Sequence, residues 1–394
     1  MDARAIVKAG RPVDQLGASR ARRGIRGRAI VITVPALALA LSLGTRPVVA
    51  ALTAQQQPET ARPSFSEWLA GVRAEAIARG IGAEVVDAAL AEVSEPLPII
   101  LERDRSQAET VLSLEQYLAR RLTAKLIKGG REANATHRAL LDQIAERYGV
   151  PARIIVAIWG AESNFGRFSG VRPTVSALAT LAWDPRRAAF FRGELFKALE
   201  IVNRGDIDLA HLRGSWAGAM GQVQFMPSSY LEFAEDFDGD GRRDIWSTPS
   251  DIFASIANYL KGHGWTAGET WGREVSVTPE AARRIAGDVA PRNGTCRATR
   301  NMTVTLPLAQ WHELGVRLPG GTRVPDHETA ASLVSGSTRH FLVYPNYDAL
   351  LEYNCAHSYA ISVALLGDAI VSTAPPPSPR KARPRAPRRR GRRP

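Results

Sequence analysis

The chain has 394 residues, of which 45% are hydrophobic, and a formal net charge of +12. This composition is that of a globular protein with a sizeable core, organised as one large domain or two ordinary ones. The positive charge lies at the ends: residues 1–50 hold 9 Lys and Arg against 2 acidic residues, and residues 374–394 hold 9 against none. Residues 51–373 are mildly acidic, so a fold built around nucleic acid is not expected.

Residues 1–50 have the pattern of a secretory signal peptide with a long basic N-terminal region. An apolar run at 29–44 follows several arginines and precedes small residues, with cleavage expected near Ala50. The run is short for a membrane span, although an uncleaved membrane anchor is the alternative. No cysteine lies near the cleavage site, so a bacterial lipoprotein anchor is not expected. The mature protein is therefore expected to be exported.

After a linker at 51–64, one folded domain is predicted over 65–372. Its front part, 65–150, shows apolar residues at three- and four-residue spacing, which predicts helices. Gly149 is expected to end the last of these helices and Pro151 to open the next. Further helices are expected in the tracts 186–205, 250–264 and 357–370.

The tract 272–350 is different, because Pro and Gly are frequent and residues 302–308 alternate like a strand. A small mixed subdomain is predicted there, followed by a closing segment at 351–372. Residues 373–394 are rich in Pro and Arg, cannot bury a core, and are predicted to be disordered. The fold class expected for the whole domain is mainly α, of the α+β kind.

The stretch 156–166, VAIWGAESNFG, places one carboxylate in an otherwise apolar helix. Glu162 follows Ile158 by four residues and Trp159 by three, so it points in the same direction as they do. Burial there would raise its pKa, as a general acid working near neutral pH requires. The alternative is a structural Glu that forms hydrogen bonds at a helix end.

A glycine-rich stretch at 214–230, GSWAGAMGQVQFMPSSY, carries groups that suit a sugar. Its glycines would let backbone come close to a ligand, and its Ser and Gln side chains add neutral donors beside aromatic faces. A sugar has an apolar ring face and a rim of hydroxyl groups, which this combination matches. Close helix packing through the glycines is the alternative. A second stretch, WDPRR at 183–187, places two adjacent arginines after a turn.

Residues 236–246, DFDGDGRRDIW, look like the start of an EF-hand calcium loop. Carboxylates stand at positions 1, 3 and 5, a glycine at 6, and a backbone carbonyl is available at 7. Position 12 is Ser247 where a bidentate Glu is expected, and Asp251 is the expected substitute. The pattern favours a structural Ca²⁺, with an acidic turn without metal as the alternative. The ligands expected are Asp236, Asp238, Asp240, the Arg242 carbonyl and Asp251.

The chain has two cysteines, Cys296 and Cys355. In an oxidising compartment such a pair forms a disulfide that closes a long loop. Two free buried thiols are the alternative, and the sequence does not decide between them.

The combination AESNFG, DPRR, GSWAGAMGQVQFMPSSY, DFDGDG and ANYLKGHGW resembles the lytic murein transglycosylase B family, glycoside hydrolase family 103. The resemblance runs from about residue 65 to 372. It implies a lysozyme-like transglycosylase fold, mostly helical, with a catalytic core at 151–271 and a groove for glycan strands. It implies a periplasmic, monomeric enzyme that cleaves peptidoglycan between N-acetylmuramic acid and N-acetylglucosamine, and that needs no cofactor for the chemistry.

Carried over motif by motif, the resemblance implies that Glu162 is the sole catalytic acid/base. It implies a loop metal site on the five ligands given above, with one residue inserted before Asp251. The substrate-binding residues that it implies come from four segments: Arg186, Arg187, Ser215, Gln224, Phe225, Met226, Tyr259, Tyr353, Asn354 and Tyr359.

Ordinary glycosidases need two carboxylates, and no obvious second one accompanies Glu162. Glu194, Glu200 and Asp184 are interpreted as solvated or capping groups. One acid suffices if the substrate's 2-acetamido group stabilises the developing cation and its C6 hydroxyl closes onto C1, which leaves a 1,6-anhydromuramyl end. A hydrolytic muramidase on the same scaffold and a non-catalytic wall-binding protein are the alternatives. The basic tail is interpreted as a solubilising end, or as a contact with anionic envelope polymers or membrane.

Overall fold

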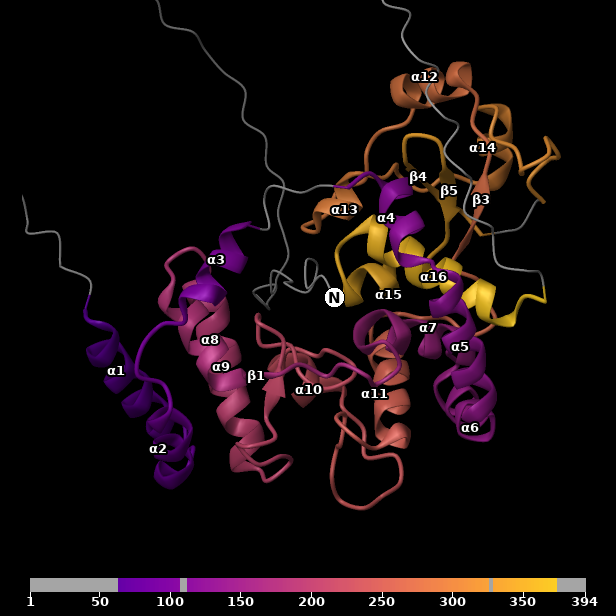
Figure 1. Cartoon of the computed structure of the whole chain (residues 1–394). Coiled ribbons are helices and arrows are strands. Elements are labelled where there is room, and N and C mark those ends of the chain that lie inside the picture. Colours follow the sequence, from indigo (N-terminus) through magenta and orange to yellow (C-terminus); the bar gives the residue numbers. More distant parts are fainter. Residues whose placement is uncertain (1–62, 107–111, 326–328, 374–394) are drawn as a thin grey trace, which may run out of the picture. The chain divides into compact units, whose positions relative to one another are not determined.

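The computed structural model describes residues 63–106, 112–325 and 329–373 (Figure 1). The predicted signal peptide and the basic tail lie outside these residues, as does nearly all of the predicted linker. Within the described part of the chain, no helix combines the length and the apolar character needed to cross a membrane.

The front part is helical, as the apolar spacing predicts. Two of its helices begin at capping boxes, formed by Ser64 with Glu67 and by Ser113 with Gln116. The last front helix ends at Gly149, which adopts the left-handed conformation that glycine tolerates best. The helices are α1 (Phe65–Ala78), α2 (Ala83–Ala91), α3 (Pro98–Ser106), α4 (Leu114–Arg121), α5 (Ala124–Thr136) and α6 (Arg138–Tyr148).

The helix that carries Glu162, α7 (Ala152–Ser163), lies in the core. It packs against α5, α6, α11 and α16, and every residue from Ile154 to Gly160 is buried. A helix that is apolar on all sides can be buried on all sides, which explains this central position. The elements that follow it are β1 (Arg172–Pro173), α8 (Thr174–Trp183), α9 (Ala188–Asn203), β2 (Arg213–Gly214), α10 (Pro227–Phe233) and α11 (Pro249–Gly262).

The tract 272–350 contains a three-stranded antiparallel sheet in the order β3-β5-β4. It has a hydrophobic cluster of its own, with Trp311 and Leu342 fully buried. The elements are β3 (Gly272–Val275), α12 (Pro279–Asp288), α13 (Arg297–Arg300), α14 (Leu308–Glu313), β4 (Ser332–Ser335) and β5 (His340–Val343). Two helices close the described chain, α15 (Asn346–Tyr353) and α16 (His357–Val371).

The strand predicted at 302–308 is wrong. Only isolated bridges form there, between Pro291 and Thr303 and between Leu306 and Ala331. Pro307 has no N–H for a sheet ladder, and it stands instead at the N-terminus of α14. The alternation of polar and apolar residues therefore reflects an extended segment that meets two different neighbours in turn.

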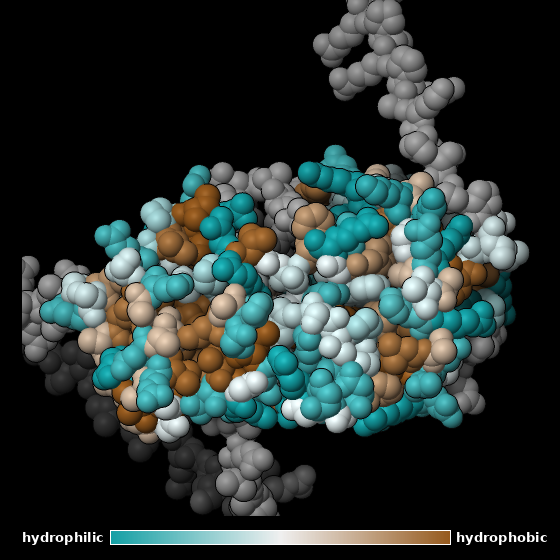
Figure 2. All heavy atoms as spheres, turned by 60° about the horizontal axis from the view of Figure 1, so that its bottom comes forward, coloured by the Kyte–Doolittle hydropathy of each residue, from teal (hydrophilic) through white to brown (hydrophobic). Residues whose placement is uncertain are grey.

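Figure 2 shows hydrophilic and hydrophobic residues interspersed over one face, with the broadest hydrophobic area on the side of α1, α2, α8 and α9. Among the described residues, the large hydrophobic side chains that are exposed are Ile99, Phe168, Val171 and Val371. Two of these, Phe168 and Val171, flank a turn at Gly170 that leads from α7 into β1.

We expect the substitution Gly170→Ala to destabilise the protein by about 2–4 kcal/mol. Gly170 has a φ of +95°, and an added Cβ would lie 2.1 Å from the backbone carbon of Gly214. The atoms nearest to this Cβ all belong to the backbone of Gly214 in β2, so they cannot move aside unless β1 and β2 separate. Urea denaturation measures the loss. The control is Gly193→Ala, at a helical site with nothing within 4 Å of the added atom. Equal stability of the two variants would contradict the close approach of Gly170 to Gly214.

Candidate active site

Glu162 stands in the last turn of α7 and meets two tyrosines from the end of the chain. Tyr359, in the first turn of α16, donates a hydrogen bond from its hydroxyl to Glu162 Oε1 at 2.5 Å. Tyr353, at the end of α15, stacks on Tyr359 with a distance of 6.4 Å between ring centroids. Both tyrosines are buried, whereas Glu162 keeps part of its side chain accessible. The carboxyl group is therefore enclosed by protein, while the residue as a whole keeps part of its surface accessible.

This environment sets the charge state of Glu162. Burial raises its pKa to about 7, while the hydrogen bond from Tyr359 and the positive charge of Arg121 act in the opposite direction. Burial, with the nearby Glu162 carboxylate, also raises the pKa values of Tyr353 and Tyr359 well above the ordinary range, so both stay protonated donors. A carboxyl group with a pKa near 7 can give and take a proton at neutral pH.

The backbone is strained directly after Glu162. Asn164 and Phe165 have φ values of 51° and 59°, in the left-handed region that non-glycine residues rarely adopt. The Phe165 ring fills the space above Gly160, where an added Cβ would lie 2.5 Å from it. Such strain is typical of functional sites, where surrounding structure holds it in place.

The glycine-rich stretch forms a tight loop beside the aromatic residues. Ser215 Oγ accepts hydrogen bonds from the N–H groups of Ala217 and Ala219 at 3.2 and 3.1 Å. Gln224 has a φ of 54°, and its Nε2 donates to the Gly221 carbonyl at 2.8 Å. The glycines also serve close packing, the alternative weighed above, since an added Cβ at Gly218 would lie 2.3 Å from a side-chain carbon of Leu178.

An aromatic cluster joins this loop to α11 and α15. Phe225 lies 5.3 Å from Tyr259 and 5.9 Å from Tyr353 between ring centroids, and the two tyrosines are 4.8 Å apart. Tyr353 donates a hydrogen bond to the Val223 carbonyl at 2.7 Å, and Met226 precedes the first residue of α10. The structure thus brings Phe225, Tyr259, Tyr353 and Tyr359 together with Glu162.

Asn354 follows Tyr353 directly and is buried. Its side-chain Oδ1 has no hydrogen-bond partner among the described residues. A buried acceptor without a partner is costly, and one beside a candidate site is available to a donor on a ligand.

Arg186 and Arg187, which were predicted to bind substrate, pair with a carboxylate of the protein itself. Both donate from Nη2 to the buried carboxylate of Asp104 on α3. Among the described residues, neither arginine has a recorded contact with Glu162 or with the tyrosines around it. The structure therefore places the pair against α3 and leaves its part in substrate binding as a prediction.

The other carboxylates considered are used elsewhere. Glu194 is buried and accepts a hydrogen bond from the Ser228 N–H at 2.8 Å, in the first turn of α10. Asp184 accepts from the Arg186 N–H, and Glu200 is exposed on α9 beside Arg204. Glu200 is therefore a solvated group, and Asp184 and Glu194 are buried groups that each accept a hydrogen bond from a backbone N–H, so all three fall within the capping or solvated roles inferred from the sequence.

The sequence did not single out Arg121 or Asp104, each of which contacts a predicted site segment. Arg121, on α4, donates from Nη2 to the Ala161 carbonyl at 2.9 Å, directly before Glu162. Gln222 accepts from Trp159 Nε1 at 2.7 Å and so ties the glycine-rich loop to α7. Asp104 holds the two arginines. Gln222 was expected among the neutral donors of the glycine-rich stretch. Nothing in the sequence indicated the contacts of Arg121 or Asp104, because each reaches its partner by packing of distant helices.

The acidic loop brings three of its predicted ligands together. Carboxylate oxygens of Asp236, Asp238 and Asp251 lie within 4.8 Å of one another. Burial raises the pKa of Asp251 to about 6, with a further contribution from the two neighbouring carboxylates. Asp240 lies outside this group, and its Oδ1 accepts from the Arg242 N–H at 2.8 Å. Three converging carboxylates with partly buried charge fit a hard divalent cation.

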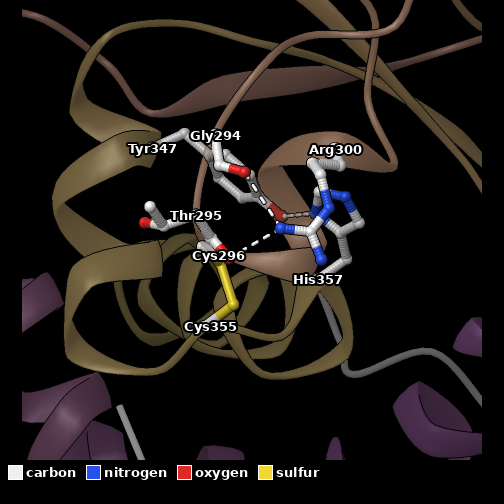
Figure 3. The surroundings of a disulfide bond; sticks show 7 residues. All are labelled: Gly294, Thr295, Cys296, Arg300, Tyr347, Cys355 and His357. Carbon is white, nitrogen blue, oxygen red and sulfur yellow. Dashed lines mark hydrogen bonds between the residues drawn. A yellow bond between two sulfur atoms is a disulfide. The ribbon is translucent and has the colours of Figure 1, made fainter. Parts of the chain in front are cut away.

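Cys296 and Cys355 form a disulfide across a sequence separation of 59 residues (Figure 3). Cys296 precedes α13, and Cys355 lies in the turn between α15 and α16 that also holds the tyrosines of the site. Beside the bridge, Tyr347 and the Nδ1 of His357 form a hydrogen bond at 2.9 Å, and Arg300 Nη1 donates to the Gly294 and Thr295 carbonyls. The disulfide thus fastens the Tyr353–Tyr359 turn to the mixed tract.

This fold and site agree with one family of proteins. The model of the transglycosylase SLT domain matches residues 64–368, which is most of the chain. The chain therefore belongs to the SLT transglycosylase family, and its helical fold is the lysozyme-like fold of that family.

A curated relative is the membrane-bound lytic murein transglycosylase B of Escherichia coli (strain K12), 36% identical over 232 residues. The match covers 58% of this chain and 60% of that protein, so the chain spans less than two thirds of the curated relative's length.

Solved structures are similar as well. SltB3 from Pseudomonas aeruginosa, in complex with NAG-anhNAM-pentapeptide, is 38% identical with a TM-score of 0.70, over 78% of this chain and 79% of that one. The Escherichia coli lytic transglycosylase Slt35, in complex with calcium, is 29% identical with a TM-score of 0.62, over 79% and 93%.

Proposed function

We propose that the protein is a peptidoglycan lytic transglycosylase. The observation that carries this proposal is Glu162, a partly accessible residue whose single carboxyl group is hydrogen-bonded to Tyr359 and has a pKa of about 7. The complex of the similar SltB3 with NAG-anhNAM-pentapeptide supports the substrate class. One carboxyl group that is protonated in part of the molecules at neutral pH can act as acid and then as base.

In this mechanism, protonated Glu162 donates its proton to the glycosidic oxygen between N-acetylmuramic acid and N-acetylglucosamine. The C1–O bond breaks, and the 2-acetamido group of the muramyl residue stabilises the positive charge that develops at C1. Ionised Glu162 then accepts the proton of the C6 hydroxyl, whose oxygen forms a bond to C1. The product is a 1,6-anhydromuramyl end, the carboxyl group returns to its protonated form, and no water is consumed.

Tyr359 is proposed to hold Glu162 in one orientation through both steps. Its hydroxyl donates to Oε1, and a hydrogen bond to an ionised carboxylate is stronger than one to the neutral acid. The other oxygen then faces the substrate. The low accessibility around the tyrosines also limits entry of water, which favours closure by the C6 hydroxyl over hydrolysis.

The remaining predicted residues are proposed to bind the glycan. Ser215 Oγ already accepts two backbone N–H groups, which leaves its own O–H to donate to a sugar. Asn354 Oδ1 is available as an acceptor, and the Phe225 and Tyr259 rings provide apolar walls. Arg186 and Arg187 are proposed to meet anionic groups of the muramyl peptide, in exchange for part of their contact with Asp104.

The test is the mass of the fragments that the protein releases from purified peptidoglycan. Muropeptides one water lighter than hydrolysis products, formed by residues 51–394 and not by Glu162→Gln, would establish the lytic reaction. Fragments of full mass with reducing ends would identify a hydrolytic muramidase. Binding of the wall without any release would identify a binding protein.

We also propose a structural Ca²⁺ at the loop of Asp236, Asp238 and Asp251, a choice of ion supported by the calcium complex of Slt35. We expect millimolar Ca²⁺ to stabilise the protein by about 1–3 kcal/mol, because a cation bound only by the folded state shifts the unfolding equilibrium. Asp251→Asn should abolish this effect, since it removes the buried ligand. Thermal unfolding with calcium or with a chelator measures it.

The control for this prediction is Asp288→Asn, an exposed aspartate on α12 that should leave the calcium response unchanged. Unfolding temperatures that do not respond to calcium in the wild-type protein, with no heat of binding in calorimetry, would contradict a metal site.

The organisation around this domain is likewise a proposal. Residues 1–50 would export the protein to the periplasm, and residues 65–372 would form a monomeric catalytic domain. The basic tail would contact anionic envelope polymers or membrane; its removal after Thr373 should then weaken binding to anionic vesicles at low salt.

A further inference from the structure

One charged residue near Glu162 comes from outside every motif that we singled out. Arg121 ends α4, and its Nη2 donates to the carbonyl of Ala161 at 2.9 Å. Ala161 precedes Glu162 in the last turn of α7, where backbone carbonyls have no partner within the helix. A guanidinium group at this position satisfies one of these carbonyls and meets the negative end of the helix dipole.

The helix α4 is held at both of its ends. Near its N-terminus, Glu115 Oε1 accepts hydrogen bonds from the N–H groups of Thr338 and Arg339 at 2.8 and 3.2 Å, in the turn between β4 and β5. Along its length it packs against α16, the helix that carries Tyr359. Arg121 is thus held at the end of α7 by a helix that hydrogen bonds and packing fix in place.

The groups that act on Glu162 are few. Tyr359 comes from α16, Tyr353 from α15 and Arg121 from α4. Tyr117, also on α4, acts on Tyr359, and its ring centroid lies 6.0 Å from the Arg121 guanidinium carbon. Among these described neighbours, Arg121 is the one that carries a positive charge. Burial alone would favour the protonated acid throughout the cycle, yet the second step requires an ionised carboxylate.

We propose that Arg121 is a positioning residue that holds the end of α7 and keeps Glu162 able to ionise near neutral pH. This inference rests on the proposed function. Arg121 is not a catalytic residue, because its hydrogen bond goes to the backbone next to Glu162 and its effect on the carboxyl group is electrostatic.

The first readout is the pH profile of kcat/KM on soluble glycan fragments. The alkaline limb reports the loss of protonated Glu162, so Arg121→Met should move it to higher pH by about one unit, since a nearby opposite charge shifts a pKa by that order. Arg121→Lys keeps the charge and should restore most of the profile. Tyr359→Phe removes the other group that favours ionisation and should shift the limb in the same direction.

The matched control is Arg120→Met. Arg120 belongs to the same last turn of α4 and is exposed, so this variant loses the same charge and a similar stem without touching α7. Its pH profile should coincide with that of the wild-type protein. A shift as large as that of Arg121→Met would show a general effect of net charge and would overturn the proposal.

The second readout does not need activity. The carboxyl carbon of Glu162 can be titrated by NMR in protein labelled with ¹³C at glutamate carboxyl groups, with Glu162→Gln for the assignment. A higher pKa in Arg121→Met and a restored one in Arg121→Lys would support the proposal even if the glycan is not cleaved, in which case only the proposed function fails. An unchanged pKa with a lowered unfolding temperature would overturn it, because Arg121 would then be only structural.

Discussion

Glu162→Gln is expected to lower the rate of glycan cleavage at pH 7 by about 10³-fold, the order that a positioned acid/base contributes. Gln has the same shape and still accepts the hydrogen bond from Tyr359, but it can neither donate nor remove the proton that the reaction transfers. Measurement of kcat/KM by chromatography of released fragments tests this. Glu200→Gln, on the exposed side of α9, is the control and should retain full activity.

The stability of the wild-type protein should depend on pH through Glu162, and Glu162→Gln should lack this dependence. Burial raises the pKa of Glu162 in the folded protein to about 7, above the ordinary value of 4.5. The stability that protonated Glu162 contributes is therefore fully present below pH 4.5, and it is lost as the pH rises through 7.

Above pH 7 the wild-type protein should consequently be less stable than Glu162→Gln, by at most about 3 kcal/mol because the partial exposure of the side chain reduces the penalty. Urea denaturation of both proteins at pH 5 and pH 8 measures the difference. If the difference in unfolding free energy between the two proteins were the same at pH 5 and at pH 8, the carboxyl group would not be buried as described, even if the activity result held.

Removal of the disulfide is the second change with a large expected effect. The double variant Cys296→Ser, Cys355→Ser should lose about 3–4 kcal/mol of unfolding free energy, because the unfolded chain regains the freedom of a loop of about 60 residues. Urea denaturation measures the loss. The wild-type protein treated with a thiol reductant should approach the double variant, and the double variant itself should not respond to the reductant.

If the wild-type protein and the double variant proved equally stable in the absence of reductant, the bridge would not be formed in solution. The alternative of two free thiols, which the sequence left open, would then hold. The disulfide fastens the turn before Tyr359, so a fall in activity of the double variant at temperatures where it remains folded would show how much of the site depends on that turn.

Much of the fold was predictable because local signals dominate in it. The helices up to Gly149 follow apolar spacing, caps and a glycine stop, and these act within a few residues. The strand expected at 302–308 failed because the alternation of side chains does not record whether a partner strand is present. The sheet that does form pairs β5 with both β3 and β4, and β3 lies some 65 residues earlier in the chain.

The site likewise contains features that the sequence predicts and features that it does not. The burial and raised pKa of Glu162 were predictable because it lies on an apolar helix face. Its catalytic role and the tyrosines came from the family resemblance, and that role stays a prediction. The contacts of Arg121 and Asp104 were not predictable, since each is an ordinary charged residue on an amphipathic helix until packing brings it to its partner. The separation of Asp240 from the other loop carboxylates is also a matter of backbone geometry that spacing alone does not contain.

The hydrogen bond between Tyr359 and Glu162 joins residues 197 positions apart, and α16 is the last helix of the described chain. A nascent or truncated chain that ends before α16 therefore has the acid but neither its partner nor the helix that encloses it. Contacts of such long sequence separation form late in folding, since the entropy of closing the loop must be overcome first. The site is consequently completed only when the domain itself is complete, so partly made chains should be unable to cut glycan.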